Sequence, residues 1–165
     1  MTGDLPVSGV IPILEMTGED DEETQRLREM EQRARDFISD FEWCEEIRDF
    51  YFGAGVGDVF AVFLAHIRPA QPSVDEYLWI VVGDFPSAYL VTDDCANPRE
   101  ALEGYIWEMR KWVDLAREGR SSDDVIPVNV PATPERAESL ESRLDTLEQK
   151  VIPIWFSSPG DSSSE

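Results

Sequence analysis

Apolar residues in the first long segment of the chain recur every three or four positions. This spacing places them on one side of a helix. The acidic run 19–23 precedes them, where the positive end of a helix dipole favours carboxylates. We therefore expect a long helix from about Glu22 to Tyr51, with an apolar stripe made of Leu27, Met30, Ala34, Phe37, Phe41, Cys44 and Ile47.

Three apolar runs after this helix are typical of strands. Residues 59–67 form a continuous run of strand length, and residues 77–82 and 88–91 form two more. The loop 83–87 between the last two contains Gly, Asp, Pro and Ser, which favours a hairpin. Three glycines within 53–57 predict a turn before the first of these strands. The patch 10–14 fits either a short edge strand or an ordered arm.

Two further helices have clear start signals. The first of them begins with Asn97 as the N-cap and Pro98 at the first helical position. Glu100 can accept a backbone N–H at the helix start, and this helix should reach Glu118. A last helix starts at Thr133 and Pro134. Its apolar row, like the stripe of the first helix, fits a coiled-coil seam between chains or docking within one chain. We favour docking within the chain, with a homo-oligomer through the helices as the alternative.

The order of these elements predicts an α+β fold. We expect a small antiparallel three-stranded sheet packed with helices, a long acidic N-terminal helix and a C-terminal helix. The expected limits are a flexible arm at 1–18, an α+β core domain at 19–119 and a linker at 120–132. A C-terminal helix with its end segment should occupy 133–156, and a disordered tail 157–165.

Charge narrows the range of partners. The chain has 35 acidic and 14 basic residues in 165, and its net charge of -21 repels phosphate backbones and anionic lipid headgroups. We expect neither nucleic-acid nor membrane binding. The sequence shows no secretory signal and no apolar span of ~20 residues, so we expect a cytoplasmic location. Cys44 and Cys95 belong to no ligand motif and are expected to be free thiols, with Cys44 buried.

Few residues could carry catalysis. The one histidine, His66, lies in an apolar run, and no lysine follows the glycines of 53–57, so we expect no metal, no cofactor and no phosphate loop. Asp84, Asp93 and Asp94 flank one strand of the hairpin, where carboxylates could bind a metal or share acid and base work. Simple turn formation is the alternative for them. Arg99 could hold an anion or form a local ion pair.

Three motifs in the middle of the chain occur at characteristic distances from one another. They are Trp43 with Cys44; Gly83, Asp84, Pro86, Ser87 and Tyr89 after Trp79; and Pro98, Arg99, Glu100 and Ala101 before Trp107. This pattern resembles a family of small uncharacterised bacterial domains. Because that family has no known function, the resemblance supports the fold and the domain limits and implies no activity. It selects Asp84, Tyr89 and Arg99 as residues to test.

These observations favour an acidic cytoplasmic protein-interaction module, immunity- or antitoxin-like, that binds a basic protein surface. The first helix carries its main binding candidates, Asp20, Asp21, Glu22 and Glu23, because only four arginines offset nine carboxylates between Glu19 and Asp40. A solvated helix face without a partner is the simpler interpretation. The alternative function is a small hydrolase or metal-dependent enzyme that uses Asp84, Asp93 and Asp94, although a protein without catalytic activity is favoured.

Overall fold

The computed structural model describes residues 5–57, 59–93, 95–118 and 134–155. These residues belong to two compact units, Met1–Gly104 and Tyr105–Glu165, and the division falls inside one helix. The expected linker 120–132 and tail 157–165 lie outside the described residues. Within the described residues, no helix is both long and apolar enough to span a bilayer.

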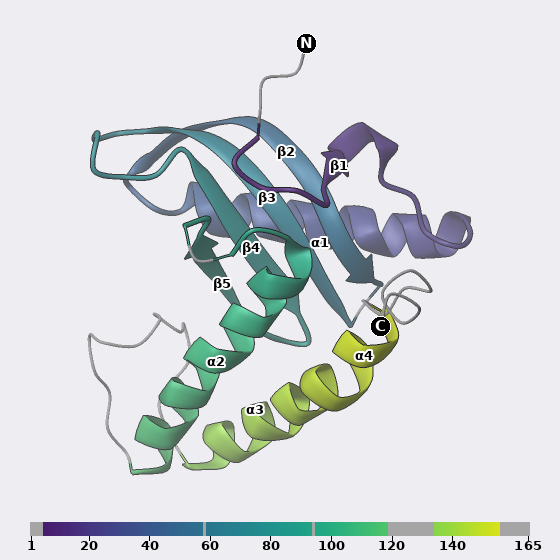
Figure 1. The fold of residues 1–165 in the computed structure, drawn as a ribbon, viewed down its shortest axis with the longest axis vertical. Helices are drawn as coiled ribbons and strands as arrows, with labels where there is room; N and C mark the ends of the chain where they lie inside the picture. The colour runs from purple at the N-terminus through teal and green to yellow at the C-terminus, as the bar shows by residue number, and fades with distance from the viewer. Residues whose placement is uncertain (1–4, 58, 94, 119–133, 156–165) are drawn as a thin grey trace, which may run out of the picture. The chain divides into compact units, whose positions relative to one another are not determined.

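The first unit contains an antiparallel sheet of five strands in which each strand pairs with the next along the chain (Figure 1). The strands are β1 (Ile11–Pro12), β2 (Cys44–Val56), β3 (Phe60–Pro69), β4 (Tyr77–Gly83) and β5 (Phe85–Val91). The predicted α+β class and antiparallel sheet are confirmed. The prediction of three strands is wrong, because β1 and β2 extend the sheet beyond β3.

The first helix, α1 (Asp21–Ser39), is much shorter than predicted. Its C-cap is Asp40, and the segment predicted as its second half forms β2, which pairs with β3 from Cys44 opposite Pro69 to Val56 opposite Phe60. Pairing with a distant strand satisfies the backbone groups of this segment, and its aromatic and β-branched residues suit a strand. Cys44 therefore lies on a strand and is partly exposed, which corrects the prediction of a buried helical thiol.

The glycine-rich segment also differs from the expected turn. Gly53 and Gly55 lie inside β2, and the turn to β3 follows them, closed by a bond of 2.9 Å from Val59 N to Val56 O. A Cβ on Gly55 would lie 3.1 Å from the side chain of Leu27 in α1. The absence of a side chain there lets β2 and α1 approach each other closely.

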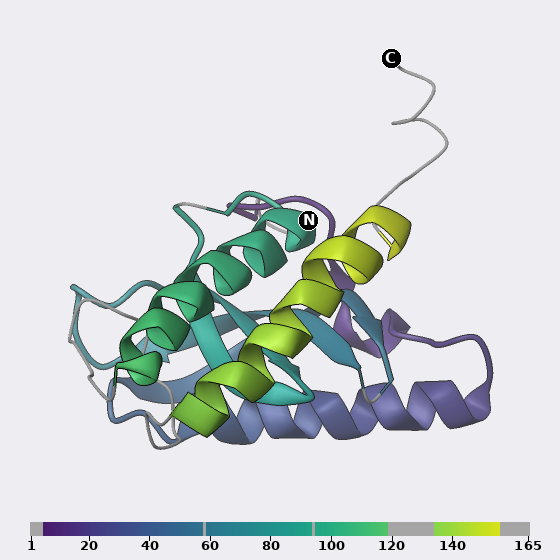
Figure 2. The same cartoon turned by 90° about the horizontal axis from the view of Figure 1, so that it is seen from below.

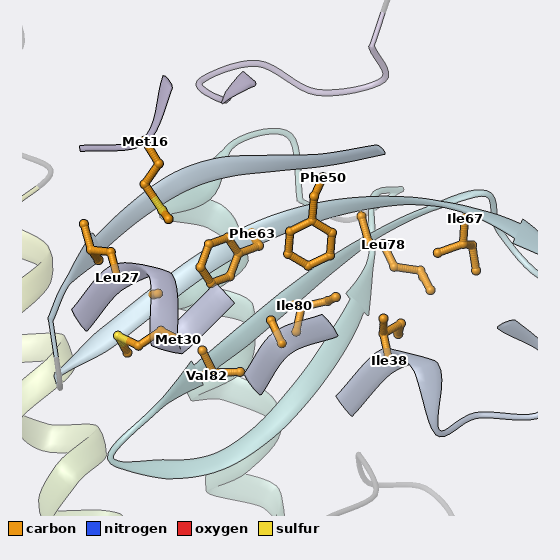
Figure 3. Packing of buried hydrophobic residues seen from close by; sticks show 13 residues of the cluster. Met16, Leu27, Met30, Ile38, Phe50, Phe63, Ile67, Leu78, Ile80 and Val82 are labelled. Carbon is orange, nitrogen blue, oxygen red and sulfur yellow. The ribbon is translucent and has the colours of Figure 1, made fainter. Parts of the chain in front are cut away.

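Helix α1 lies along one face of the sheet (Figure 2). The core between them consists of residues from α1, of residues from alternate positions of the strands, and of Met16 from the segment before α1 (Figure 3). Leu27, Met30 and Ala34 of the predicted stripe are buried, and Ile38 follows them in place of the predicted Phe37, which is only partly buried. The buried strand residues on this face are Phe50, Ala61, Phe63, Ala65, Ile67, Leu78, Ile80 and Val82.

The other face of β3 and β4 is buried as well. Phe60, Val62, Leu64, Trp79 and Val81 are all fully buried, as continuous apolar runs predict for strands covered on both sides. The indole of Trp79 donates a hydrogen bond of 2.9 Å to the carbonyl oxygen of Cys95. This bond fixes the segment between β5 and the next helix over the sheet.

The hairpin of β4 and β5 is tighter than the predicted five-residue loop. Only Asp84 separates the two strands, and its backbone nitrogen donates to the carbonyl oxygen of Val59 at 3.2 Å. A Cβ on Gly83 would lie 2.4 Å from that same oxygen. Glycine is therefore required where the β2–β3 turn and this hairpin meet.

Helix α2 (Pro98–Arg117) begins as its sequence predicts. Glu100 N donates to the Asn97 side chain at 2.9 Å, and Ala96 N donates to the Glu100 carboxylate at 2.8 Å. Further along, Trp112 is buried, whereas Trp107 is 62% exposed and lies under the ammonium group of Lys111. Trp107 therefore does not belong to the core.

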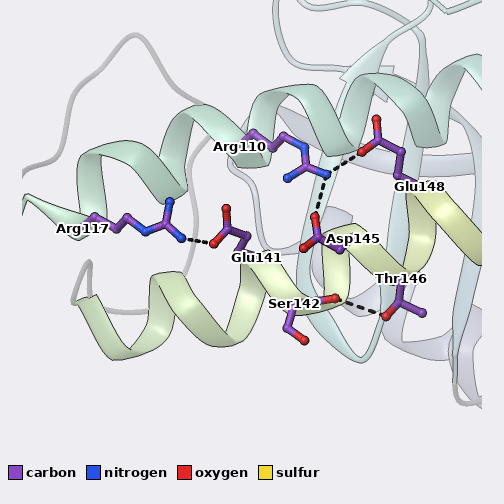
Figure 4. Close-up of polar contacts among 7 residues, drawn as sticks. All are labelled: Arg110, Arg117, Glu141, Ser142, Asp145, Thr146 and Glu148. Atoms are coloured by element: carbon purple, nitrogen blue, oxygen red, sulfur yellow. Dashed lines mark hydrogen bonds and ion pairs between the residues drawn. The ribbon is translucent and has the colours of Figure 1, made fainter.

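The second unit also contains α3 (Pro134–Thr146), a π-helical turn (Leu147–Val151) and α4 (Ile152–Trp155), which form one continuous helical segment. Its predicted apolar row is buried at Ala137, Leu140, Leu144 and Leu147. Arg110 of α2 lies between Asp145, at 3.1 Å, and Glu148, at 2.6 Å, and Arg117 pairs with Glu141 (Figure 4). The opposite order of these partners along the chain makes the two helices antiparallel neighbours.

Candidate interaction surface

The four acidic residues that open α1 have different roles. Asp20 is the N-cap, and its carboxylate accepts the Glu23 backbone N–H at 2.8 Å. Glu23 in turn accepts the N–H of Gly57 at 2.8 Å, which ties the helix start to the β2–β3 turn. Glu22 pairs with Arg26 at 3.0 Å, and Asp21 is exposed. Two of the four predicted binding residues therefore hold the fold together.

The arginines of α1 are engaged in contacts within the first unit. Arg28 donates to the carbonyl oxygen of Ile13 at 3.1 Å and to Glu31 at 3.2 Å. Arg33 donates to the carbonyl oxygen of Gly83 at 3.0 Å. Arg35 pairs with Glu31 at 2.8 Å and lies over the Phe50 ring at 4.4 Å. Three of the four arginines are thus directed toward the sheet or the N-terminal segment.

The exposed side of α1 is correspondingly acidic. Helix residues that are four, seven or eight positions apart lie on the same side, and this places one set of carboxylates opposite the buried row, from the first turn to the C-cap. We call this set the acidic face of α1; it consists of Asp21, Glu22, Glu29, Asp36 and Asp40, all of which are exposed. Exposed carboxylates in a row attract cationic groups and repel phosphates.

Four aromatic rings meet at the C-terminal end of α1. Phe41 lies 5.3 Å from Phe37, 4.7 Å from Trp43 and 5.2 Å from Tyr89, measured between ring centroids. Trp43 and Tyr89 also meet edge to face at 5.2 Å. We call Phe37, Phe41, Trp43 and Tyr89 the aromatic cluster. Its rings pack against the core, yet each is only partly buried.

The electrostatics around the aromatic cluster are unusual for a helix end. The last turn of α1 has no basic residue, although the negative end of the helix dipole favours one. Instead Asp36, Asp40 and Glu42 are exposed there. Burial raises the pKa of Tyr89 above its ordinary value, so its phenol is neutral at physiological pH. The negative charge at this place therefore comes from carboxylates alone.

The two described carboxylates of the hydrolase alternative do not lie close together. Asp84 precedes β5 and the exposed Asp93 follows it, and a seven-residue strand spans roughly 20 Å. Asp94 lies outside the described residues. Arg99 pairs with Glu103 at 3.2 Å, which is a local ion pair, one of the two expected roles of this residue. In the described part of the chain, no three His, Cys, Asp or Glu side chains are placed to hold a metal ion.

One polar row was missed by sequence reasoning. Asp49, His66 and Tyr77 are direct neighbours on β2, β3 and β4. The His66 Nδ1 lies 3.1 Å from Asp49, its Nε2 lies 3.5 Å from Glu76, and its ring stacks on Tyr77 at 4.3 Å. A protonated imidazole could donate to both carboxylates. Recognising 44–56 as a strand would have placed Asp49 on the strand next to that of His66.

Comparisons with known proteins give no relative. No family model, no curated protein and no solved structure matches this chain. The resemblance to uncharacterised bacterial domains therefore rests on its motifs alone. Two of those motifs do meet in space, since Trp43 contacts Tyr89 in the aromatic cluster.

Proposed function

We propose that this chain is a protein-interaction module that binds a basic protein surface through the acidic face of α1. The observation that carries the proposal is the division of charge on this helix. Its arginines make contacts inside the unit, while the carboxylates at Asp21, Glu29, Asp36 and Asp40 stay exposed. The helix therefore exposes a row of carboxylates on one face, while three of its four arginines contact the sheet or the N-terminal segment.

The length and regularity of this face suit an extended basic surface. At ~1.5 Å per residue, the distance along the helix from Asp21 to Asp40 is roughly 28 Å, and carboxylates occur along all of it. Regularly spaced anions of this kind resemble a row of phosphates. A natural partner is thus a protein with a basic groove, such as a nuclease, for which the module would act as an immunity protein or antitoxin.

Long-range attraction supports fast association with such a partner. The net charge of -21 steers cationic proteins toward the molecule, and the acidic face orients them as they approach. Exposed charges are screened beyond ~8 Å at physiological ionic strength, so the association rate should fall as salt rises. The dissociation rate should depend mainly on close contacts and change less.

The experiment compares three immobilised proteins in a lysate of the source organism. They are the parent, the variant Asp21→Asn, Glu29→Gln, Asp36→Asn, and the control Asp75→Asn, Asp114→Asn, Glu138→Gln. The control loses the same charge from exposed positions on other elements. Asp20 and Glu23 remain unchanged in both, because they cap α1 and bind Gly57.

We expect parent and control to retain a basic protein that is released by high salt, and the acidic-face variant to lose it. Mass spectrometry identifies the retained protein, and surface plasmon resonance with the purified pair then gives both rate constants. Equal capture by all three proteins would refute the role of α1. Retention of acidic or uncharged proteins alone would refute the proposed class of partner.

A further inference from the structure

We propose that the aromatic cluster at the end of α1 receives an arginine side chain of the basic partner. This inference rests on the proposed function and names the close contact that long-range attraction alone does not supply. Trp and Tyr are the residues that most often dominate binding energy at protein interfaces. Here Trp43 and Tyr89 lie together, partly exposed, beside the acidic face.

The chain fills two of its other aromatic surfaces with its own cations. The Arg35 guanidinium lies 4.4 Å from the centroid of Phe50, and the Lys111 ammonium lies 4.0 Å from the centroid of Trp107. Among residues 5–57, 59–93, 95–118 and 134–155, no arginine or lysine lies over a ring of the aromatic cluster. A cation on the surface of the cluster would therefore have to come from outside the described residues.

Charge complementarity decides which occupant fits. Asp36, Asp40 and Glu42 are exposed in the last turn of α1 and just after it, and the negative end of the helix dipole adds to their field. A guanidinium can stack its plane on an aromatic ring while its N–H groups donate to carboxylates. An uncharged side chain would use the rings and leave the carboxylates unpaired. A second copy of this acidic chain would bring like charges together.

The cluster is also preorganised. Phe41 touches all three other rings, which come from α1, from the segment after it and from β5, so the rings already hold one another in place. A cation that docks on them does not have to order them first, which keeps the entropic cost of binding low. The site should therefore slow dissociation of the partner more than it speeds association.

The first experiment uses the unmodified protein, because the rings also close one end of the core. A hexa-arginine peptide is titrated into the isotopically labelled full chain at low salt and followed by NMR. We expect the largest shifts at the indole of Trp43 and at Phe41 and Tyr89, with ring-current shifts of the arginine side-chain protons. Hexa-citrulline, the uncharged isostere, should cause none of them.

The second experiment measures the affinity of the same peptide for ring variants. Tyr89→Leu should weaken binding roughly fivefold, the size of a solvent-exposed cation–π contact. Tyr89→Phe, which keeps the ring, should bind as the parent does. Trp107→Leu removes an exposed tryptophan elsewhere and should also leave the affinity unchanged. Thermal unfolding of each variant checks that it is folded at the temperature of the binding measurement.

The outcomes separate the two proposals. Peptide shifts along Asp21, Glu29 and Asp36 without shifts in the aromatic cluster would overturn this inference and leave the acidic face intact. The absence of shifts both in the acidic face of α1 and in the aromatic cluster would overturn this inference and the proposed function. Equal shifts with hexa-citrulline would show that the rings bind apolar surface and not a cation, which would also overturn the inference.

Discussion

The indole of Trp43 meets the phenol ring of Tyr89 edge to face, with centroids 5.2 Å apart, although one follows α1 and the other lies in β5. Phe41 stacks on the same indole at 4.7 Å. The contact ties the edge strand of the sheet to the end of the helix that covers it. Aromatic pairs of this geometry add about 1 kcal/mol beyond the area that they bury.

Replacing Tyr89 tests this contact. Tyr89→Ala should lower the free energy of unfolding by about 2 kcal/mol, less than a fully buried ring would cost, because the side chain is only partly buried. Tyr89→Phe should change it little, since the ring stays. Urea denaturation followed by circular dichroism measures both. If Tyr89→Phe lowered the free energy of unfolding as much as Tyr89→Ala does, the hydroxyl group and not the ring would be the source of the stabilisation.

The start of α1 offers a matched pair of acidic residues. Asp20→Ala should cost about 1 kcal/mol of stability, because it removes the acceptor for the Glu23 N–H. Asp21→Ala removes the same charge but no cap bond. Its loss in the free energy of unfolding should therefore be about half as large and should be smaller at high salt. Equal losses in the two variants, measured by urea denaturation, would mean that the charge and not the cap stabilises the helix.

The two thiols should react at different rates. Cys95 is buried and should stay unmodified by iodoacetamide in the native protein, whereas the partly exposed Cys44 should be alkylated. Burial raises the pKa of Cys44, so less thiolate is present and its reaction should be slower than in the unfolded chain. Peptide mass spectrometry locates the label. Alkylation of Cys95 before Cys44 would contradict the structure.

The buried Tyr105 should affect how the stability of the protein falls at alkaline pH. Burial raises the pKa of Tyr105 well above its ordinary value, so the native state holds this proton more tightly than the unfolded chain does. Below pH about 10 the phenol is protonated in both states, so the contribution of Tyr105 to the free energy of unfolding is fully present. This contribution is lost as pH rises through the pKa of the native state.

Tyr105→Phe tests the sign of this effect. Because the variant has no phenol at this position, its free energy of unfolding should fall less steeply than that of the parent as pH rises above about 10. The slopes of stability against pH are compared because removal of a buried hydroxyl also changes the stability at neutral pH. Parallel slopes would show that Tyr105 ionises as easily in the native state as in the unfolded chain.

Elements with local signals were predictable from sequence. The start of α2 was recognised because Asn97 and Glu100 satisfy backbone N–H groups within one turn, which needs no distant partner. The buried strands β3 and β4 were recognised because a continuous apolar run must be covered on both faces. The buried half of α1 followed from its periodicity at Leu27, Met30 and Ala34.

Residues 44–56 form a strand because they pair with β3. The spacing of Phe41, Cys44 and Ile47 suits a helix as well as it suits the observed turn and strand. The pairing of β2 with β3, with Phe50 opposite Ala65 and Phe52 opposite Phe63, is what makes this segment a strand. Such long-range hydrogen bonds leave no trace in local spacing, and the error hid the pair of Asp49 and His66.

The acidity of α1 can be read from the amino-acid sequence alone, because charge is a property of composition. What this acidity can do depends on how the chain packs. The tertiary structure turned Arg28 and Arg35 toward the N-terminal segment and the sheet, used Asp20 and Glu23 as structural acceptors, and left the middle and end of the helix acidic on the outside. It also assembled the aromatic cluster from α1, the segment after it and β5, because contacts between distant segments depend on packing of the whole sheet and not on neighbours in the chain.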